Sequence, residues 1–482
     1  MRKRNHPLYV VKHMIQIIKQ IIVPIFFLMI ANFKNVTPLI LIIGAVILFV
    51  LIIFFAILNW KNSIYYIENE TLIIEKGVFS KSKQAIAFDK ITTMNESQEL
   101  LEKIFGLATF KVDAGSATKG NEVKLTISHY EAEQLRLQMS TKGQNINTDA
   151  KVIEKTQRVY SLNYKDLMKY AVTNCNLLLG IVLVSTLIQF INDIPVVGDH
   201  FEQYMNGWKK VFNKMGFEHL PIRSMIILSI TILMIYLVVS FIVSVIRTFV
   251  KYYGFTLSRQ SKELEISYGL IDRKSFMLSA NKITALYISY SLFGRLVGLG
   301  ELKIENIGYG DEKGEVAILF PIIQKKKIDK LLREVLPEFL TQEAEWIRPD
   351  KRSKLSYVIR YAIFPLIGAI VLTVLYKYGY LTFIVVVFMI LCGYLAHQQA
   401  GTQAAGDKRV FSKGIFGKKI IIVKNKFFQS YTVSQNPLQK RKNLVNIKYS
   451  YQSNNLGGAV GIKGMDKKAV ENGNLGLDMF ML

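Results

Sequence analysis

The sequence predicts a membrane protein in which six apolar helices, paired as three hairpins, alternate with three small antiparallel β domains. Three observations predict this fold class. The chain of 482 residues is 51% hydrophobic, yet its formal net charge is +25. Long uncharged segments separate basic polar regions, and the polar regions repeat one another. Disorder and a disulfide scaffold are excluded, because so apolar a chain can bury a core and has only two cysteines.

Six apolar segments are expected to cross the membrane as helices. A helix needs about 20 residues to cross a hydrocarbon core of about 30 Å. The segments are residues 14–31, 36–58, 170–192, 224–246, 361–376 and 381–396. The first contains Lys19 and Pro24, and an interfacial amphipathic helix is its alternative interpretation. Cys175 and Cys392 lie in or at the end of these segments, where each is interpreted as a small apolar residue.

The distribution of Lys and Arg predicts the orientation of the hairpins. Basic residues precede or begin the first, third and fifth segments and follow the second and fourth. The opposite side carries mainly the loop 193–221, whose charges are mixed. Cytoplasmic loops are the ones that carry excess Lys and Arg. We therefore expect a multi-pass protein of the cell (plasma) membrane with both termini and the three β domains in the cytoplasm.

The polar regions contain an internal repeat. A shift of 192 residues superposes 77–112 on 269–304 without a gap. The identical pairs are Gly77/Gly269, Lys90/Lys282, Ile91/Ile283, Thr92/Thr284, Ser97/Ser289, Leu100/Leu292, Gly106/Gly298, Leu107/Leu299 and Lys111/Lys303. A third, diverged copy follows the last apolar segment, with Gly414 in place of Gly77 and Asn443 in place of Gly106. Aligning Lys426 with Lys90 requires a one-residue gap. Duplication explains this pattern.

Each copy has the pattern of β structure closed by a helix. Leu264, Ile266 and Tyr268 alternate with polar residues, which is the period of a half-buried strand. Gly269 then marks a turn that requires a residue without a side chain. A closing helix is indicated by the capping-box spacing of 128–131 and by the apolar spacing of 328–335. In the third copy, Asp466 begins a shorter helical pattern.

These observations divide the chain into hairpins, β domains and linkers. The predicted boundaries are 1–60 (basic N-terminus and hairpin 1), 61–142 (β domain 1), 143–169 (linker), 170–250 (hairpin 2), 251–340 (β domain 2), 341–355 (linker), 356–398 (hairpin 3) and 399–482 (diverged β domain 3).

The turn at Gly77, the Lys90-Ile91-Thr92 segment and the stretch 100–107 with its Phe-Gly-Leu end resemble the bacterial pleckstrin-homology (PH)-like domain family. Three copies with three hairpins resemble its large multi-pass members, the YdbT type. The resemblance covers about residues 60–140, 250–340 and 400–470 and is loosest in the third copy. It implies three PH-like all-β domains, each of two roughly orthogonal antiparallel sheets with a C-terminal helix. It supplies no active site.

Enzymatic motifs are not recognisable in this sequence. The six histidines lack the spacing of metal ligands, and His200 and His219 are interpreted as parts of a solvated loop. No phosphate-binding loop or nucleophile elbow occurs. We therefore expect a protein that is not an enzyme, with no catalytic residue, cofactor or metal site. No small-molecule substrate is identified, and no nucleic-acid binding is expected.

The basic surplus is concentrated in the third β domain. Residues 407–468 contain 14 Lys and Arg but only two Asp. Near an anionic leaflet each such cation gains on the order of 1 kcal/mol. The candidate surface for anionic lipid or an acidic partner comprises Lys408, Arg409, Lys413, Lys418, Lys419, Lys424, Lys426, Lys440, Arg441 and Lys442. A solvated, lysine-rich surface without a partner is the alternative.

The function expected from the sequence is that of a scaffold or envelope-homeostasis (stress-resistance) protein. Its PH-like modules would bind membrane lipids, a partner protein or further copies of the chain. A transporter or exporter component for a lipid or an antimicrobial peptide is the alternative.

Overall fold

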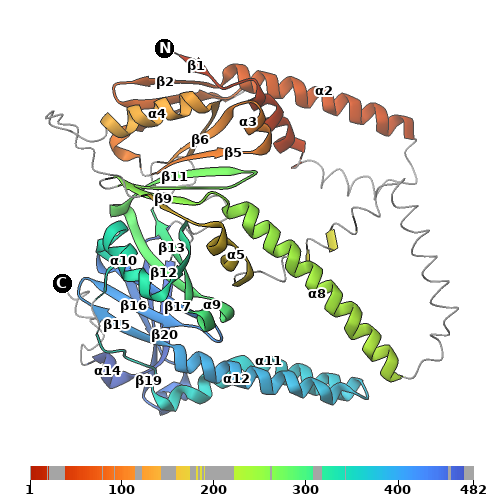
Figure 1. Ribbon diagram of the computed structural model, residues 1–482, viewed down its shortest axis with the longest axis vertical. Coiled ribbons are helices and arrows are strands. Elements are labelled where there is room, and N and C mark those ends of the chain that lie inside the picture. The colour runs from red at the N-terminus through yellow and green to blue at the C-terminus, as the bar shows by residue number, and fades with distance from the viewer. Residues whose placement is uncertain are drawn as a thin grey trace.

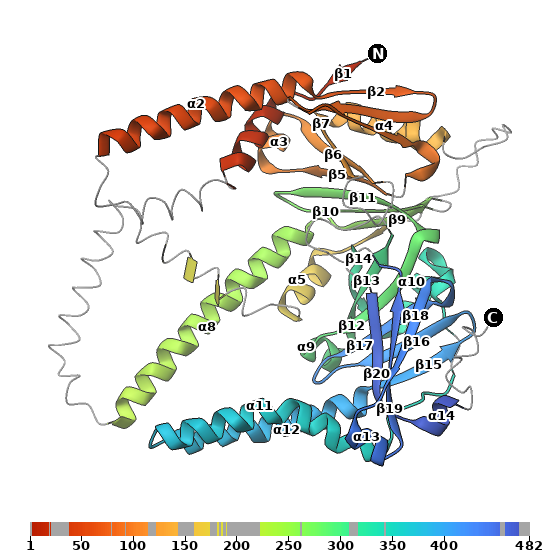
Figure 2. The same ribbon diagram turned by 180° about the vertical axis from the view of Figure 1, so that it is seen from behind.

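The computed structural model describes residues 2–18, 20, 38–78, 80–91, 93–113, 122–142, 159–173, 222–260, 263–307, 317–341, 344–453 and 458–471, and isolated positions between 181 and 189. The β domains form a stack, and the long helices extend from one side of that stack (Figures 1 and 2). The N-terminal domain lies at one end of the stack and the C-terminal domain at the other.

The helices on this side are those of the predicted hairpins. They are α2 (Pro38–Asn62), α5 (Tyr164–Thr173), α8 (Ile222–Tyr252), α11 (Lys354–Leu375) and α12 (Phe383–Gln399). Three described helices are long and apolar enough to cross a membrane: Ile230–Tyr252, Lys351–Leu375 and Gly379–Gln399. They coincide with the fourth, fifth and sixth predicted segments. Leu8–Ile18 and Val46–Asn62 are shorter apolar helices.

The described part of the structure does not contain all six predicted spans. The second predicted segment lies mostly in α2. Most of the first and third predicted segments, with Cys175 and the loop 193–221, falls outside the described residues. In the third hairpin, Gly393 allows close helix packing, since a Cβ there would lie 2.7 Å from the Cα of Val358.

Each β domain, called unit 1, 2 or 3 below, contributes six strands. Unit 1 contains β2 (Ile64–Glu68), β3 (Thr71–Lys76), β4 (Ser82–Ala87), β5 (Thr93–Gln98), β6 (Leu107–Asp113) and β7 (Glu122–Ser128). Unit 2 contains β9 (Thr256–Gln260), β10 (Glu263–Tyr268), β11 (Arg273–Ser279), β12 (Ile283–Tyr290), β13 (Leu299–Asn306) and β14 (Ala317–Gln324). Unit 3 contains β15 (Gly401–Ala405), β16 (Lys408–Lys413), β17 (Lys418–Lys424), β18 (Phe428–Ser434), β19 (Leu444–Tyr451) and β20 (Gly458–Asp466).

A helix closes each unit on the side of the stack opposite the hairpins (Figures 1 and 2). These helices are α4 (His129–Lys142), α10 (Lys325–Val335) and α14 (Lys467–Glu471). The predicted caps are present, because Ser128 Oγ accepts a hydrogen bond from the amide of Glu131 and Asp466 Oδ1 accepts one from that of Lys468. The predicted apolar face of α10 is buried throughout.

The sheets do not end at the unit boundaries. Their strand orders are β1-β2-β3-β4, β7-β6-β5-β11-β10-β9-β8, β14-β13-β12-β17-β16-β15 and β18-β19-β20, where β1 is Lys3–Arg4 and β8 is Val159–Ser161. Strand β5 of unit 1 therefore pairs with β11 of unit 2, and β12 of unit 2 pairs with β17 of unit 3. The units share sheets rather than standing as separate domains.

Both junctions have the same register. Gln98 lies opposite Arg273 in the first junction, and Tyr290 lies opposite Lys418 in the second. Tyr290 is the repeat equivalent of Gln98, 192 residues later. The segment before each hairpin also pairs with the first strand of its unit, through Arg4↔Ile64, Ser161↔Thr256 and Ile347↔Thr402. Parts of both predicted linkers thus belong to the sheets.

Most of the repeated residues lie in turns or in the core of their units. Gly106, Gly298 and Asn443 all have positive φ, at 64°, 71° and 51°. Gly77 and Gly269 have φ of 115° and 117°, and a Cβ at either would lie within 2.0 Å of a carbonyl oxygen three residues later. Leu107, Ile283, Thr284 and Leu299 are buried, and Lys282 Nζ donates to the Ile91 carbonyl at 3.2 Å. Lys90 is exposed, and Thr92 lies outside the described residues.

The third copy follows the first with a constant offset. The 3₁₀ turn Phe88–Lys90 of unit 1 corresponds to Asn425–Phe427 of unit 3, 337 residues later. Asn443 corresponds to Gly106 by the same offset. Phe427, not Lys426, therefore occupies the position of Lys90. The gap required to align Lys426 with Lys90 does not exist in the structure.

Candidate membrane-facing site

In each unit a short helix, here called a bridging helix, connects the first two strands of the unit's second sheet. The bridging helices are α3 (Leu100–Ile104), α9 (Leu292–Val297) and α13 (Pro437–Arg441). Helices α3 and α9 lie on the side of the stack from which the hairpins extend (Figures 1 and 2). Repeat equivalence places α13 at the same position in unit 3.

The bridging helices expose large apolar side chains. In unit 1 these are Leu100, Leu101, Ile104 and Phe105, and in unit 2 they are Leu292, Phe293, Leu296 and Val297. Leu296 is 78% exposed and Ile104 is 68% exposed. Contiguous exposed apolar groups are typical of surfaces that contact a membrane or a protein. The sequence analysis did not predict this exposed surface, although Leu100 and Leu292 are repeat equivalents.

Unit 3 has cations where the other two units have apolar residues. Arg441 stands at the position of Ile104 and Leu296, and Lys442 stands at that of Phe105 and Val297. Both cations are exposed, as are Lys440 and the apolar Leu438. The surface of α13 is therefore one leucine beside three cations, whereas those of α3 and α9 are mainly apolar.

Buried polar groups fix the orientation of each bridging helix. Glu99 and Glu102 form a capping box on α3, and Lys12 of the N-terminal helix pairs with the buried Glu102 at 2.7 Å. In unit 2, Ser291 caps α9 and also donates to the Thr173 carbonyl of α5 at 2.9 Å. Helices that lead into hairpins thus hold α3 and α9 directly. In unit 3, α13 has its own capping box.

A basic residue of two bridging helices reaches the next unit. Lys103 Nζ donates to the Leu270 carbonyl at 3.0 Å, and Arg295 Nη1 donates to the Phe416 carbonyl at 3.3 Å. Lys103 and Arg295 are repeat equivalents, and their acceptors lie in equivalent turns after Gly269 and Gly414. Lys440 is the corresponding residue of unit 3. We call this repeated contact the basic clamp.

The ten candidate cations divide into two sets of five. Arg409 is buried and donates to the Tyr449 hydroxyl at 2.5 Å, and Lys424 is buried 4.5 Å from the ring centroid of Phe339. Lys408 donates to the Leu340 carbonyl. Lys418 and Lys419 are half-buried in β17 at the junction with unit 2, and burial lowers the pKa of both.

These five side chains stabilise the packing of unit 3 and its junction, so the prediction of one open ten-residue surface is wrong for them. Lys413, Lys426, Lys440, Arg441 and Lys442 are exposed. Of these, the last three adjoin one another at the end of α13.

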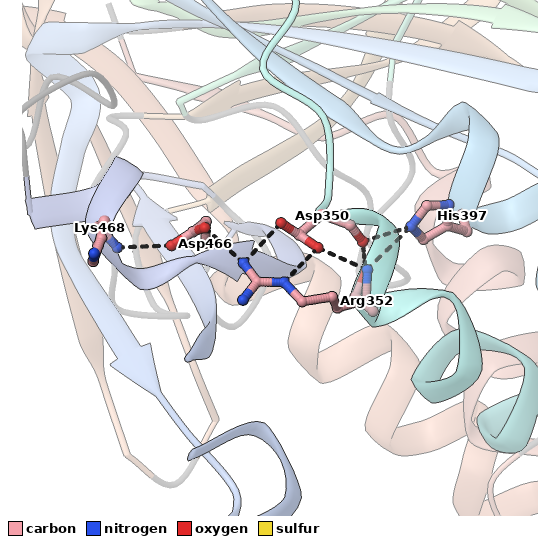
Figure 3. Close-up of polar contacts among 6 residues, drawn as sticks. Asp350, Arg352, His397, Asp466 and Lys468 are labelled. Atoms are coloured by element: carbon pink, nitrogen blue, oxygen red, sulfur yellow. Dashed lines mark hydrogen bonds and ion pairs between the residues drawn. The ribbon is translucent and has the colours of Figure 1, made fainter. Parts of the chain in front are cut away.

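A second polar cluster fixes the base of the third hairpin (Figure 3). Arg352 donates to both carboxylate oxygens of Asp350 at 2.9 Å and to Asp466 at 2.7 Å. His397, at the end of α12, contacts the Asp350 carbonyl and Ser353 Oγ, both at 3.1 Å. Arg352 lowers the pKa of the Asp350 carboxyl through these hydrogen bonds. The cluster joins hairpin 3 to α14, and sequence spacing gave no sign of it.

Candidate metal ligands do not gather in the part of the chain that the structure describes. No group of three His, Cys, Asp or Glu side chains there could hold a metal ion. His129, the first residue of α4, lies with Nδ1 2.5 Å from Oε1 of Glu96. His200 and His219 lie outside the described residues.

Three segments of the chain match the bacterial PH domain family, at residues 22–143, 216–338 and 362–472. Each matched segment contains one unit and part of the predicted hairpin before it. The chain belongs to the bacterial PH domain family. It is similar to a protein of Bacillus subtilis (strain 168) described as "UPF0699 transmembrane protein YdbT", with 30% identity over 473 residues, which cover 94% of this chain and 93% of that protein. No solved structure matches the chain.

These matches confirm the resemblance to repeated PH-like domains of the YdbT type. The chain is a membrane protein with three PH-like units, as the apolar helices and the family match both indicate. The PH-like β architecture is confirmed, with the difference that sheets run across the unit boundaries.

Proposed function

We propose that this protein is a non-enzymatic membrane scaffold whose three PH-like units lie against the cytoplasmic leaflet and bind anionic lipid there. The exposed apolar residues of α3 and α9, on the side of the hairpins, carry this proposal (Figures 1 and 2). Helices α2, α8 and α11 enter the bilayer from that side, so the bridging helices lie near the membrane surface. Leu296 and Ile104 would then insert between headgroups.

The charges of α13 support binding to an anionic surface. Lys440, Arg441 and Lys442 project from the end of this helix, and each gains on the order of 1 kcal/mol beside an anionic leaflet. Units 1 and 2 would contact the membrane through apolar residues, while unit 3 would contact it through charge. Attachment at three points would hold the stack at a fixed height over the bilayer, which suits a scaffold that presents its far face to other molecules.

The test uses the whole chain, because unit 3 shares a sheet and a core with unit 2. With both native cysteines replaced by alanine, Leu438→Cys carries an environment-sensitive fluorophore, and the protein is placed in lipid nanodiscs. We expect a blue-shifted emission when the nanodiscs contain anionic lipid but not when they are zwitterionic. Added salt should reverse the shift, since salt screens exposed charges.

The matched variants change three charges each. Lys440→Glu, Arg441→Glu and Lys442→Glu together should abolish the lipid-dependent shift. Lys326→Glu, Lys327→Glu and Lys330→Glu together place the same charges on α10, on the opposite side of the stack, and should leave it intact. The same emission wavelength in anionic and zwitterionic nanodiscs would refute the proposal. The alternative, a transporter or exporter component, predicts flux of a lipid or peptide across proteoliposomes.

A further inference from the structure

The stack of units ends in two complementary strand edges. Within the chain, the β5 edge of unit 1 meets the β11 edge of unit 2, and the β12 edge of unit 2 meets the β17 edge of unit 3. The equivalent of β11 and β17 in unit 1 is β4, and the equivalent of β5 and β12 in unit 3 is β18. Among the described strands, β4 and β18 are each last in their sheets. They belong to units at opposite ends of the stack (Figure 1).

We propose that copies of this chain associate head to tail, with β18 of one copy pairing antiparallel with β4 of the next. This inference rests on the sheet edges and on the repeated junctions, and Lys440 is the one residue that it shares with the proposed lipid-binding surface. Two junctions of this kind, β5 with β11 and β12 with β17, occur within the chain in the same register. The pairing of β18 with β4 would be a third such junction, formed between two molecules.

The sequence of β18 and its exposed face fit this pairing. Ser434 and Gln435 repeat Ser97 and Gln98, which lie opposite Lys274 and Arg273 in the first junction. Val433 is 44% exposed, whereas its equivalents Glu96 and Ile288 are both 8% exposed. Contact with a following unit buries those two side chains, and β18 lacks a following unit within its own chain.

The charges along β4 do not oppose the pairing. Edge lysines often protect a strand from association. Here Lys418 and Lys419 of β17, and Arg273 and Lys274 of β11, occupy the corresponding edge and are paired nonetheless. Lys81 is the equivalent of Arg273 and Lys418. Basic residues at this edge are therefore part of the repeated junction.

The basic clamp extends to the same interface. Lys103 and Arg295 each bind a carbonyl in the glycine turn of the following unit. Lys440 is their equivalent in unit 3, and the equivalent of the Leu270 acceptor is Val78 in unit 1 of the next copy. Both parts of the junction, the strand edge and the clamp, are thus present at the two ends of one chain. Such a head-to-tail interface forms a ring if it closes and a filament if it does not.

The register of the intrachain junctions specifies the intermolecular one. By the repeat offsets, Ser434 lies opposite Ser82, and Val433 lies opposite Lys83. Directly opposite residues in an antiparallel pair have Cα atoms about 4.5–5.5 Å apart, which is within the range of about 4.4–6.8 Å that a disulfide spans.

Two differently tagged full-length chains, both with Cys175→Ala and Cys392→Ala, provide the test. One carries Ser434→Cys and the other Ser82→Cys, and both are expressed together and oxidised in their native membranes. We expect a reducible species with twice the mass of the chain that contains both tags. Replacing Ser434→Cys by Val433→Cys turns the thiol to the other face of the strand, so this pair should give little of that species.

Four results would overturn the proposal. They are the absence of the doubly tagged species, equal yields from the two pairs, cross-links formed by either variant alone, and cross-links only to a different protein. Circular dichroism and thermal unfolding of each variant should match those of the cysteine-free parent. The lipid-dependent emission described above is measured separately, so either proposal can fail while the other stands.

Discussion

The ammonium group of Lys12 lies 2.7 Å from Oε1 of Glu102, a carboxylate that is fully buried at the start of α3. Thr109 donates its hydroxyl to the same oxygen at 2.6 Å, and the Glu99 amide donates to Oε2 at 3.0 Å. The N-terminal helix is thereby fixed to the bridging helix of unit 1. A buried ion pair thus joins the N-terminal helix to the apolar surface of α3.

Removing Lys12 should strongly destabilise unit 1. Lys12→Met leaves a buried carboxylate without its cation, which costs on the order of 3–5 kcal/mol. Lys3→Met is the control, because the Lys3–Glu131 pair, at 2.8 Å, is exposed and such pairs contribute about 0–1 kcal/mol. Denaturant unfolding of the solubilised chain measures both. Equal losses in the two variants would contradict the role assigned to Glu102.

The left-handed turn after each bridging helix should tolerate Asn but not Ala. Gly298 has φ of 71°, and nothing lies within 4 Å of a Cβ placed there. Gly298→Ala should therefore cost about 1–2 kcal/mol from backbone strain alone. Gly298→Asn should cost less, since Asn443 adopts this conformation in unit 3. The free energies of unfolding of both variants test this, and equal costs would refute it.

The junction between units 2 and 3 should weaken at alkaline pH. Tyr287 and Tyr451 both donate hydroxyl groups to the buried Glu305, and burial together with the Glu305 charge raises the pKa of both phenols. The unfolded phenols have a pKa of about 10. The stability from these phenols is complete below that pH and is lost as pH rises above it, because the unfolded state then releases protons first.

Tyr451→Phe should reduce the slope of stability against pH above about pH 10, near the unfolded phenol pKa. Urea unfolding at a series of pH values compares it with the parent chain. Parallel pH profiles for the two chains would show that Tyr451 does not contribute in this way.

The base of hairpin 3 should lose stability in acid. Arg352 lowers the pKa of Asp350, so this carboxylate stabilises the fold above its unfolded pKa and the contribution disappears as pH falls. Arg352→Gln should lower the stability only modestly at neutral pH, since the Arg352 side chain is exposed and exposed ion pairs contribute little. The variant should also flatten the acid limb of the stability profile. Lys351→Gln, at an exposed neighbouring position, should change neither.

Sequence periodicity predicted the units and much of the membrane region for physical reasons. Apolar runs such as 224–246 have few structural alternatives, and the repeated glycines mark turns that only a small set of residues can form. The repeat also placed Asn443 at the position of Gly106, and the structure shows positive φ at both residues. These features depend on local sequence.

The pairing of strands from different units, and the burial of some basic residues, depend on contacts that are not local in the sequence. Nothing in β5 itself indicates that β11 lies beside it, because edge pairing is made by backbone groups common to all residues. Lys424 and Arg409 were predicted to be surface cations, but both are buried. Their long side chains pack against apolar groups while the charged ends contact Phe339 and Tyr449. Conversely, the 78% exposure of Leu296 was not predicted, because the sequence of α9 does not indicate which of its apolar residues the unit leaves uncovered.

Site-directed labelling in intact cells tests the central claim most directly: that the three units stack on the cytoplasmic side with their bridging helices against the membrane. Cysteine is placed singly at Leu296 in α9 or at Leu137 in α4, both exposed in the structure and on opposite sides of the stack. A membrane-impermeant thiol reagent should label neither from outside. In inside-out vesicles it should label Leu137→Cys readily and Leu296→Cys poorly until detergent is added. Labelling of either site from outside the cell, or equal labelling of both in the vesicles, would contradict the account.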